Sequence, residues 1–346
     1  MKTIIFLVLL LLLTGCGALK TLKAYSNEYD KPDANTAVSF FKDNYSQTLA
    51  TRFGLMALFS ELVYMRHLEG DRSKIDECAV NNSLLDKKFY IPPALPTSTI
   101  QEGFWSRWRP NDGDSIPACY SHEGLFYDTF VFTDKRGDIV EAVIAFRGTE
   151  NRTGEMLKDW MSNISPFFGF EPAQYQLAKG LIPKLIEALR KDSPGVRIYT
   201  TGHSLGGGLA QQAGFLSREV SEIVTFNTSP VTNWTHLRLE KKVDKKYPII
   251  YRLYHGGEGL EKARFITSTA TDSQYGRHDI SVQYEPRSSF TGHSMKIIAC
   301  AFAKLIASRD NNQEVADHYY EPHYIKQELL SEGRMCFDSN NSVTLR

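Results

Sequence analysis

The chain has 346 residues, of which 42% are hydrophobic and 23% are charged, and its formal net charge at pH 7 is zero. Such a composition is typical of globular proteins, and the length allows one large α/β domain or two smaller ones. Without a basic surplus the chain is not expected to bind nucleic acid. Zinc-site spacings such as Cys-x-x-Cys or His-Glu-x-x-His are absent from the sequence. We therefore expect no nucleic-acid partner, no metal and no other cofactor.

The N-terminus carries a short apolar segment. Lys2 is followed by an unbroken apolar run from residue 4 to residue 13, which ends in Leu13-Thr14-Gly15-Cys16. The run is too short to span a bilayer, which takes about 20 residues, so we predict a signal peptide. Its end resembles the lipobox of bacterial lipoproteins. The resemblance implies cleavage after residue 15 and a lipid anchor on Cys16, which would hold the chain outside the cytoplasm on a periplasmic or outer membrane face. A soluble secreted protein is the alternative.

Four further cysteines follow in the chain, at Cys78, Cys119, Cys300 and Cys336. An oxidising compartment favours one or two disulfides, and four cysteines allow three pairings, between which the sequence does not choose. Cys300 lies in an apolar segment, so a buried free thiol is its alternative.

The region before residue 122 is predicted to contain a spacer, helices and a loop. Residues 17–35 are polar and form the spacer. Between Val38 and Val63, apolar residues recur at intervals of three and four. This period predicts one long or two consecutive amphipathic helices packed on a core, with a membrane-surface role as the alternative. Residues 90–122 are rich in proline and glycine and are predicted to be a loop.

Three aromatic residues, Phe104, Trp105 and Trp108, lie close together in that predicted loop. We expect them to form a cover packed against the core. Docking on lipid or lining an acyl-chain groove is the alternative.

The rest of the chain alternates between strand-like and helical patterns. A hairpin comes first, and helices then alternate with strands without any internal repeat. This order predicts an α/β fold with a mostly parallel central sheet flanked by helices. The predicted strands are 125–132, 139–146, 196–201, 223–226 and 249–254, and the predicted helices are 156–164, 174–191, one starting at Ser204, and 293–307.

A nucleophile motif joins the third of these strands to its helix. Gly202, Ser204 and Gly206 form Gly-x-Ser-x-Gly between a β-rich run and a helix of small residues. In this context the motif predicts a nucleophile elbow, in which a sharp turn exposes the serine hydroxyl. The glycines are expected because side chains there would collide with the neighbouring strand and helix.

A serine hydroxyl is a weak nucleophile at neutral pH, and it needs a histidine base that is oriented by a carboxylate. On a sheet of this kind the acid and then the histidine follow the serine, each on a loop after a strand. Glu258 stands after the strand at 249–254 and a Gly-Gly turn, and is the predicted acid. Asp272 and Asp279 are its alternatives.

The predicted base is His293, which lies where a loop enters the last apolar helix. His278 is the alternative, whereas His203, next to the nucleophile, is expected to pack inside the elbow. The oxyanion requires two donors. One is the backbone N–H of Leu205, at the start of the elbow helix. The other donor is Thr149, through its N–H and its hydroxyl. It lies in Phe146-Arg-Gly-Thr149, where the predicted strand at 139–146 ends.

These residues together resemble the class 3 lipases, a branch of the α/β-hydrolases with a fungal-lipase-like fold, over about residues 121–308. The resemblance implies Ser204 as nucleophile, Thr149 and Leu205 as oxyanion donors and His293 as base. The family usually has aspartate where Glu258 stands. The resemblance also implies a lid at 150–164 beside the apolar segment 166–170. The motifs that carry it are Ala145-Phe-Arg-Gly-Thr149, Asp159-Trp160, Thr201-Gly-His-Ser-Leu-Gly-Gly207, Thr225-Phe-Asn-Thr-Ser-Pro230 and Gly292-His-Ser-Met295.

The sequence thus predicts a membrane-anchored serine esterase or lipase that hydrolyses carboxylic esters of lipids through a Ser204–Glu258–His293 triad and an acyl-enzyme. Phospholipase A1 or lysophospholipase activity is one alternative, and an inactive envelope lipoprotein that keeps the fold for binding is another. The oligomeric state is left open. The predicted division is a signal peptide at 1–15, an anchor, spacer and helical extension at 16–120, the hydrolase domain at 121–308 and a tail at 309–346.

Overall fold

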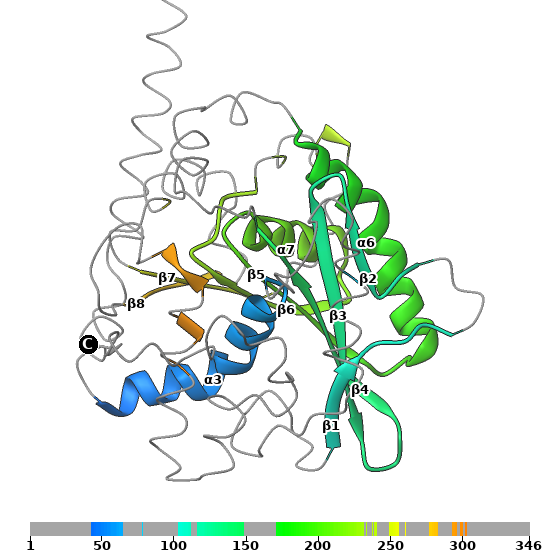
Figure 1. Ribbon diagram of the computed structural model, residues 1–346, viewed down its shortest axis with the longest axis horizontal. Helices are drawn as coiled ribbons and strands as arrows, with labels where there is room; N and C mark the ends of the chain where they lie inside the picture. Colours follow the sequence, from blue (N-terminus) through cyan, green and yellow to red (C-terminus); the bar gives the residue numbers. More distant parts are fainter. Residues whose placement is uncertain are drawn as a thin grey trace, which may run out of the picture.

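The computed structural model describes residues 43–64, 78, 103–111, 116–148 and 171–231, together with residues 233, 237, 239, 240, 249–255, 260, 277–282, 293–295, 298, 299 and 302. These residues form one mixed sheet with helices on both faces (Figure 1). None of the helices in this described part is long and apolar enough to cross a membrane. The predicted signal peptide, Cys16, the helix at 156–164 and the C-terminal tail lie outside it.

An eight-stranded sheet forms the centre of the fold. Its strands follow the order β1-β3-β4-β5-β6-β7-β8, and β2 pairs with β3 beside this path. β3 and β4 form the predicted antiparallel hairpin, whereas β4 to β8 run parallel, so the mostly parallel sheet is confirmed. The strands are β1 Gly103–Arg107, β2 Cys119–His122, β3 Leu125–Asp134, β4 Ile139–Phe146, β5 Arg197–His203, β6 Val220–Phe226, β7 Ile249–His255 and β8 Arg277–Val282.

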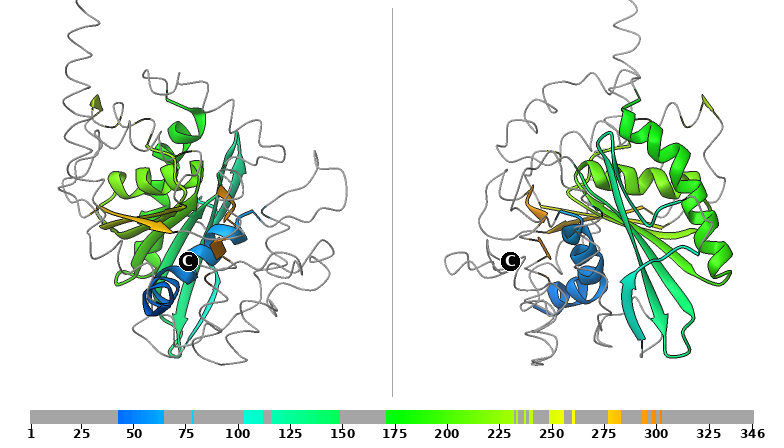
Figure 2. Two further views of the ribbon diagram at one scale, coloured as in Figure 1. Left: turned by 90° about the vertical axis from the view of Figure 1, so that its left-hand side faces the viewer. Right: turned by 45° about the vertical axis from the view of Figure 1, so that its right-hand side comes forward.

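Helices cover both faces of this sheet (Figure 2). Helix α3 (Asp43–Leu62) packs on one face against β5 and β6, while α6 (Ala173–Asp192) and α7 (Leu205–Leu216) pack on the other. Alternate residues of each strand point to opposite faces, so Val143 faces the core under α3 and Ile144 faces the core under α6 and α7. Although α3 precedes the predicted boundary at residue 121, it therefore shares the core of the sheet.

Part of the predicted loop at 90–122 is strand, and there the prediction was wrong. β1 and β2 follow one another along the edge of β3 that faces away from β4. Strands of 5 and 4 residues show too little alternation to be recognised among prolines and glycines. Trp105 and Trp108 are each 1% exposed, so the predicted packing against the core is confirmed for both tryptophans.

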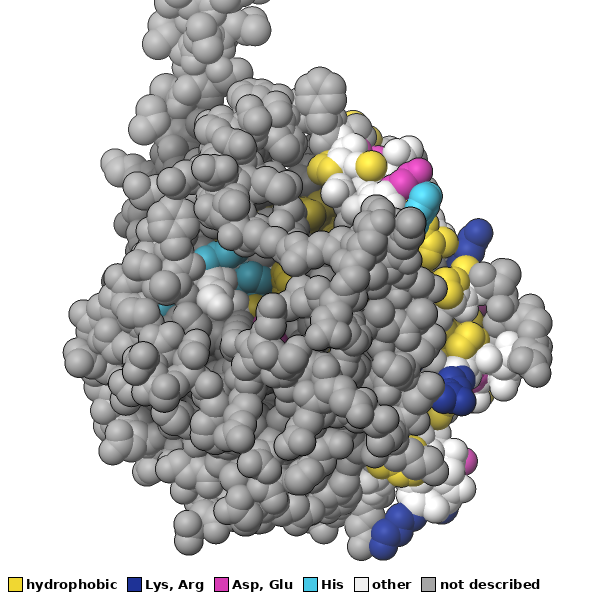
Figure 3. All heavy atoms as spheres, in the orientation of Figure 1, with side chains coloured by type: hydrophobic (Ala, Val, Ile, Leu, Met, Phe, Trp, Pro, Cys, Tyr) yellow, Lys and Arg dark blue, Asp and Glu magenta, His cyan; other side chains and the backbone are white. Residues whose placement is uncertain are grey.

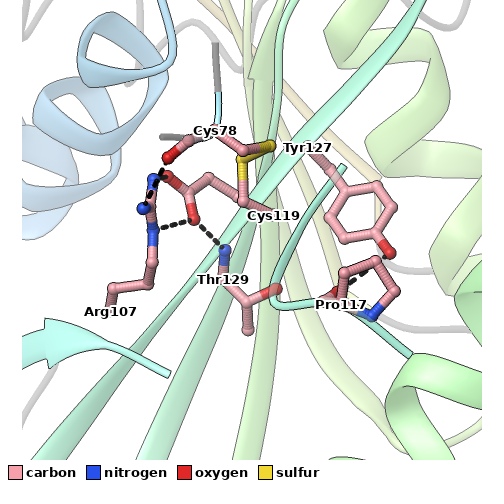
Figure 4. The surroundings of a disulfide bond; sticks show 7 residues. Cys78, Arg107, Pro117, Cys119, Tyr127 and Thr129 are labelled. Carbon is pink, nitrogen blue, oxygen red and sulfur yellow. Dashed lines mark hydrogen bonds and ion pairs between the residues drawn. A yellow bond between two sulfur atoms is a disulfide. The ribbon is translucent and has the colours of Figure 1, made fainter. Parts of the chain in front are cut away.

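A disulfide bonds Cys78 to this edge of the sheet (Figure 4). Cys78 is bonded to Cys119 at the start of β2, which is one of the three pairings that the sequence left open. Beside it, the Arg107 guanidinium forms a buried ion pair with Asp128 and donates a hydrogen bond to the carbonyl oxygen of Cys78 at 3.1 Å. Cys78 is thus held by a covalent bond and by a buried charged group.

Candidate active site

The predicted elbow joins β5 to α7. β5 ends at His203, α7 begins at Leu205, and Ser204 between them has φ 56° and ψ −126°. A residue with a side chain rarely adopts such dihedrals, which cost about 1–3 kcal/mol and persist only where the surroundings impose them. Here the surroundings are β6 and the segment after it. The Ser204 N–H donates to the carbonyl oxygen of Phe226 at 3.1 Å, and its carbonyl accepts from the Ser229 N–H at 2.9 Å.

Close packing around the elbow explains both glycines of the motif. A Cβ atom at Gly202 would lie 2.4 Å from the carbonyl oxygen of Gly206, and a Cβ atom at Gly206 would lie 2.3 Å from the carbonyl oxygen of Phe146. Both contacts are with backbone atoms, which cannot turn aside as a flexible side chain can. The first turn of α7 is therefore pressed against the ends of β4 and β5.

The same packing brings Gly148, the residue before the predicted donor Thr149, close to the backbone nitrogen of Leu205. After β4 the chain passes directly beside the elbow, because a Cβ atom at Gly148 would lie 2.6 Å from the carbonyl oxygen of His203 and 3.1 Å from the backbone nitrogen of Leu205. Leu205 is the first residue of α7, so its N–H has no partner within the helix and lies at the positive end of the helix dipole. Thr149 follows Gly148 but lies outside the described residues.

His293 lies beside the elbow, where a base is required. The ring centroids of His203 and His293 are 4.7 Å apart, and Nε2 of His203 lies 2.6 Å from the main-chain carbonyl oxygen of His293. In the space-filling view, histidine side chains reach the surface in the area where Figure 1 labels β5 and β7 (Figure 3). His203 itself is 7% exposed and bonded at both ring nitrogens, which agrees with its expected packing role.

The alternative base and one alternative acid occupy β8, a strand that the sequence did not predict. His278 is exposed and stacks on Tyr251, with ring centroids 4.9 Å apart. The carboxylate of Asp279 accepts two hydrogen bonds from Arg252, at 2.6 and 2.7 Å. Both side chains are thus engaged with β7, which argues against their roles in a triad.

Glu258 and Asp272 lie outside the described residues. β7, which precedes Glu258, ends at His255 and is the parallel neighbour of β6, as β6 is of β5. The backbone N–H of His255 donates to the Asn227 side chain just after β6. Carboxyl ends of parallel strands meet at one edge of a sheet, so β7 ends at the edge where the elbow lies.

Tyr64 is a residue of this site that was not predicted from the sequence. It directly follows the apolar stripe that ended at Val63, and nothing in its local sequence marks it. In the structure its hydroxyl contacts Gly148 and His203. Among the described residues, no group of three or more His, Cys, Asp or Glu side chains could hold a metal ion.

Comparisons with known proteins agree with this geometry. Residues 109–247 match the model of a phospholipase-like family, described as a Tle-like phospholipase domain. An extracellular phospholipase A1 from Serratia liquefaciens is 30% identical over 123 residues, which are 36% of this chain and 34% of that protein. The chain thus spans about a third of the length of this relative.

Among solved structures, lipase II from Rhizopus niveus aligns with a TM-score of 0.34 at 13% identity and covers 65% of this chain and 77% of its own. The extracellular lipase LipA from Serratia marcescens aligns with a TM-score of 0.27 at 17% identity and covers 62% of this chain and 39% of its own. Both structural similarities are weak.

The parallel sheet and the elbow between β5 and α7 are those of an α/β-hydrolase fold, and residues 109–247 are similar to a phospholipase-like family. The resemblance to lipases that the sequence predicted is confirmed. The family whose model matches residues 109–247 is that of the Tle-like phospholipases.

Proposed function

We propose that this chain is an extracytoplasmic serine hydrolase, anchored by lipid at Cys16, which cleaves carboxylic esters of lipids. Phospholipids are the favoured substrate class, because the matching family model and the Serratia liquefaciens relative are both described as phospholipases. A neutral-lipid lipase is the second candidate, since the same triad acts on any carboxylic ester and the shape of the pocket decides between them.

The observation that carries this proposal is the conformation of Ser204. It holds a strained backbone between β5 and α7, beside both the ring of His203 and the chain at His293. A protein that only bound lipid would gain nothing from such strain, whereas the sharp turn of a nucleophile elbow requires it.

In the proposed reaction, Ser204 Oγ attacks the acyl carbonyl while His293 takes its proton. Glu258 orients the imidazole, and the Leu205 N–H and Thr149 stabilise the oxyanion. His293 then returns the proton to the leaving alcohol, which leaves the acyl group on Ser204. A water molecule, deprotonated by His293, releases the fatty acid and restores the serine.

An extracytoplasmic location has two supports. Disulfides persist mainly in oxidising compartments, and Cys78 and Cys119 are bonded. The Serratia liquefaciens relative is described as extracellular. We expect Cys16→Ser to move the full-length protein from the membrane fraction to the soluble fraction; unchanged partitioning would refute the anchor alone.

A substrate panel tests the proposed activity. The full-length protein in detergent micelles would receive phosphatidylcholine, lysophosphatidylcholine and trioleoylglycerol, with Ser204→Ala as the matched control. We expect fatty acid release from the sn-1 position of phosphatidylcholine by the wild type and none above background by the variant. Faster release from trioleoylglycerol would favour the neutral-lipid lipase. No release from any lipid by the folded wild type would favour the inactive binding module.

A further inference from the structure

The turn after helix α3 places the hydroxyl group of Tyr64 at the elbow. The last turn of this helix is fastened to β5 three residues before Ser204, where the hydroxyls of Ser60 and Thr201 lie 2.8 Å apart and Thr201 also bonds to the carbonyl oxygen of Val224 at 2.8 Å. Tyr64 follows in the turn that ends the helix, with its N–H bonded to the carbonyl oxygen of Glu61 at 2.9 Å. Its position is therefore set by the core of the sheet.

The Tyr64 hydroxyl joins the two halves of the site. It accepts a hydrogen bond from the Gly148 N–H at 2.8 Å, in the turn that leads to Thr149. It also lies 3.0 Å from Nδ1 of His203 and 3.3 Å from the His203 carbonyl oxygen. The Gly148 backbone is thus held against the N–H of Leu205 by a group that comes from outside the predicted hydrolase domain.

The direction of these bonds follows from the chemistry of the groups. A main-chain carbonyl oxygen only accepts, so Nε2 of His203, 2.6 Å from the carbonyl oxygen of His293, must carry the hydrogen. Nδ1 of the neutral ring is then an acceptor, and it is the nearer of the two acceptors for the single proton of Tyr64. One chain of bonds runs from Gly148 through Tyr64 and His203 to the backbone of His293.

We propose that Tyr64 is a positioning residue of the active site, which holds the oxyanion turn at Gly148 and, through His203, the main chain of the base His293. This rests on the proposed function in that it assigns Tyr64 a part in ester hydrolysis. Tyr64 acts through Gly148 and His203, which its hydroxyl contacts. Its effect on the rate comes from keeping two separate segments in the geometry that the tetrahedral intermediate requires.

Tyr64→Phe removes only the hydroxyl, and Tyr127→Phe is its matched control. Tyr127 has a buried side chain whose hydroxyl donates a hydrogen bond to the main-chain carbonyl oxygen of Pro117 at 3.1 Å. With a soluble p-nitrophenyl ester we expect kcat of Tyr64→Phe to fall by about 10- to 100-fold, somewhat less than the loss of a direct oxyanion donor. KM should change less than about threefold, while Tyr127→Phe keeps the wild-type kcat.

A boronic acid inhibitor separates positioning from simple destabilisation, because it forms a tetrahedral adduct with the serine that needs the same oxyanion donors. The inhibition constant of butylboronic acid should rise with Tyr64→Phe by about the factor by which kcat falls. A kcat within twofold of the wild type would overturn the proposal. So would a lower kcat with an unchanged inhibition constant.

The tautomer of His203 can be measured in the wild type, and a variant is needed only to assign the signal. In ¹⁵N-histidine NMR, with the signal assigned by its loss in His203→Asn, we expect the hydrogen on Nε2 and none on Nδ1. A hydrogen on Nδ1 would overturn the proposed chain of bonds. If the wild type hydrolyses no ester, the proposed function fails, and this measurement still decides whether Tyr64 and His203 are joined as described.

Discussion

Nε2 of His203 donates a hydrogen bond to the main-chain carbonyl oxygen of His293 at 2.6 Å, across a separation of 90 residues in sequence. His203 precedes the predicted nucleophile, and His293 is the predicted base. The two segments that a serine hydrolase must bring together are therefore joined directly, even though the side chain of Glu258 lies outside the described residues.

The elbow should not accept a larger residue at Gly206. Its Cβ atom would lie 2.3 Å from the carbonyl oxygen of Phe146, so Gly206→Ala must separate α7 from β4. We expect a loss of about 1–3 kcal/mol in the free energy of unfolding and a lower kcat. Gly180→Ala in α6 is the matched control, because its Cβ would meet nothing within 4 Å, and it should stabilise by about 0.5–1 kcal/mol. Urea unfolding of both variants measures the contrast, and equal effects would contradict it.

Removal of the disulfide should destabilise the sheet edge at β1 and β2. Cys78 and Cys119 are separated by 41 residues, for which loop-closure entropy gives a stabilisation of about 4 kcal/mol. A double Cys78→Ser, Cys119→Ser variant should unfold at a lower temperature than the wild type, as calorimetry would show. Reductant should lower the unfolding temperature of the wild type but not that of the variant. An equal effect of reductant on both would indicate that this bond does not form.

Burial of Glu141 predicts a pH-dependent stability. Burial raises the pKa of Glu141 from 4.5 to about 7, although Arg197 beside it opposes the rise. Between these values the folded chain holds a proton that the unfolded chain has released, so stability falls as the pH rises from about 4.5 to 7.

Glu141→Gln lacks this titration and tests the point. The free energy of unfolding of Glu141→Gln minus that of the wild type should increase by up to about 3 kcal/mol between pH 4.5 and 7. Above pH 7 this difference should stay constant. A difference between Glu141→Gln and the wild type that does not change with pH would contradict the raised pKa.

The predicted acid Glu258 and one of its two alternatives, Asp279, should respond differently to neutralisation. Asp279 is bound by Arg252 between β7 and β8, so Asp279→Asn should lower stability and change kcat by only a few fold. Glu258→Gln should lower kcat by about 10⁴-fold with little loss of stability, because an amide no longer holds the imidazole in its catalytic tautomer. Steady-state kinetics and thermal unfolding of both variants decide the assignment. The reverse pattern would make Asp279 the acid.

The parts of the fold that could be predicted from sequence are those with a local signal. The hairpin of β3 and β4 and the turn from β5 through Ser204 to α7 follow from side-chain periodicity and from glycines that backbone crowding requires. β1, β2 and β8 were not predicted because they are short strands at the edges. They are strands because they pair with a neighbouring strand, and their own sequences show no clear strand pattern.

The role of Tyr64 could not be predicted for a related reason. Its contacts with Gly148 and His203 cross 84 and 139 residues of sequence. Only the packing of α3 on β5 brings the tyrosine to the elbow, and that packing depends on the whole core. The ion pair between Asp279 and Arg252 could not be predicted either, because β8 had not been recognised as a strand.

Covalent labelling of the serine tests the central claim most directly. The folded wild type, treated with an alkyl fluorophosphonate and analysed by intact mass and peptide mapping, should gain a single adduct at Ser204. Ser204→Ala, shown to be folded by its unfolding temperature, should gain none. A folded wild type that stays unlabelled, or a variant labelled as fully as the wild type, would contradict the assignment of Ser204 as the nucleophile of a lipid ester hydrolase.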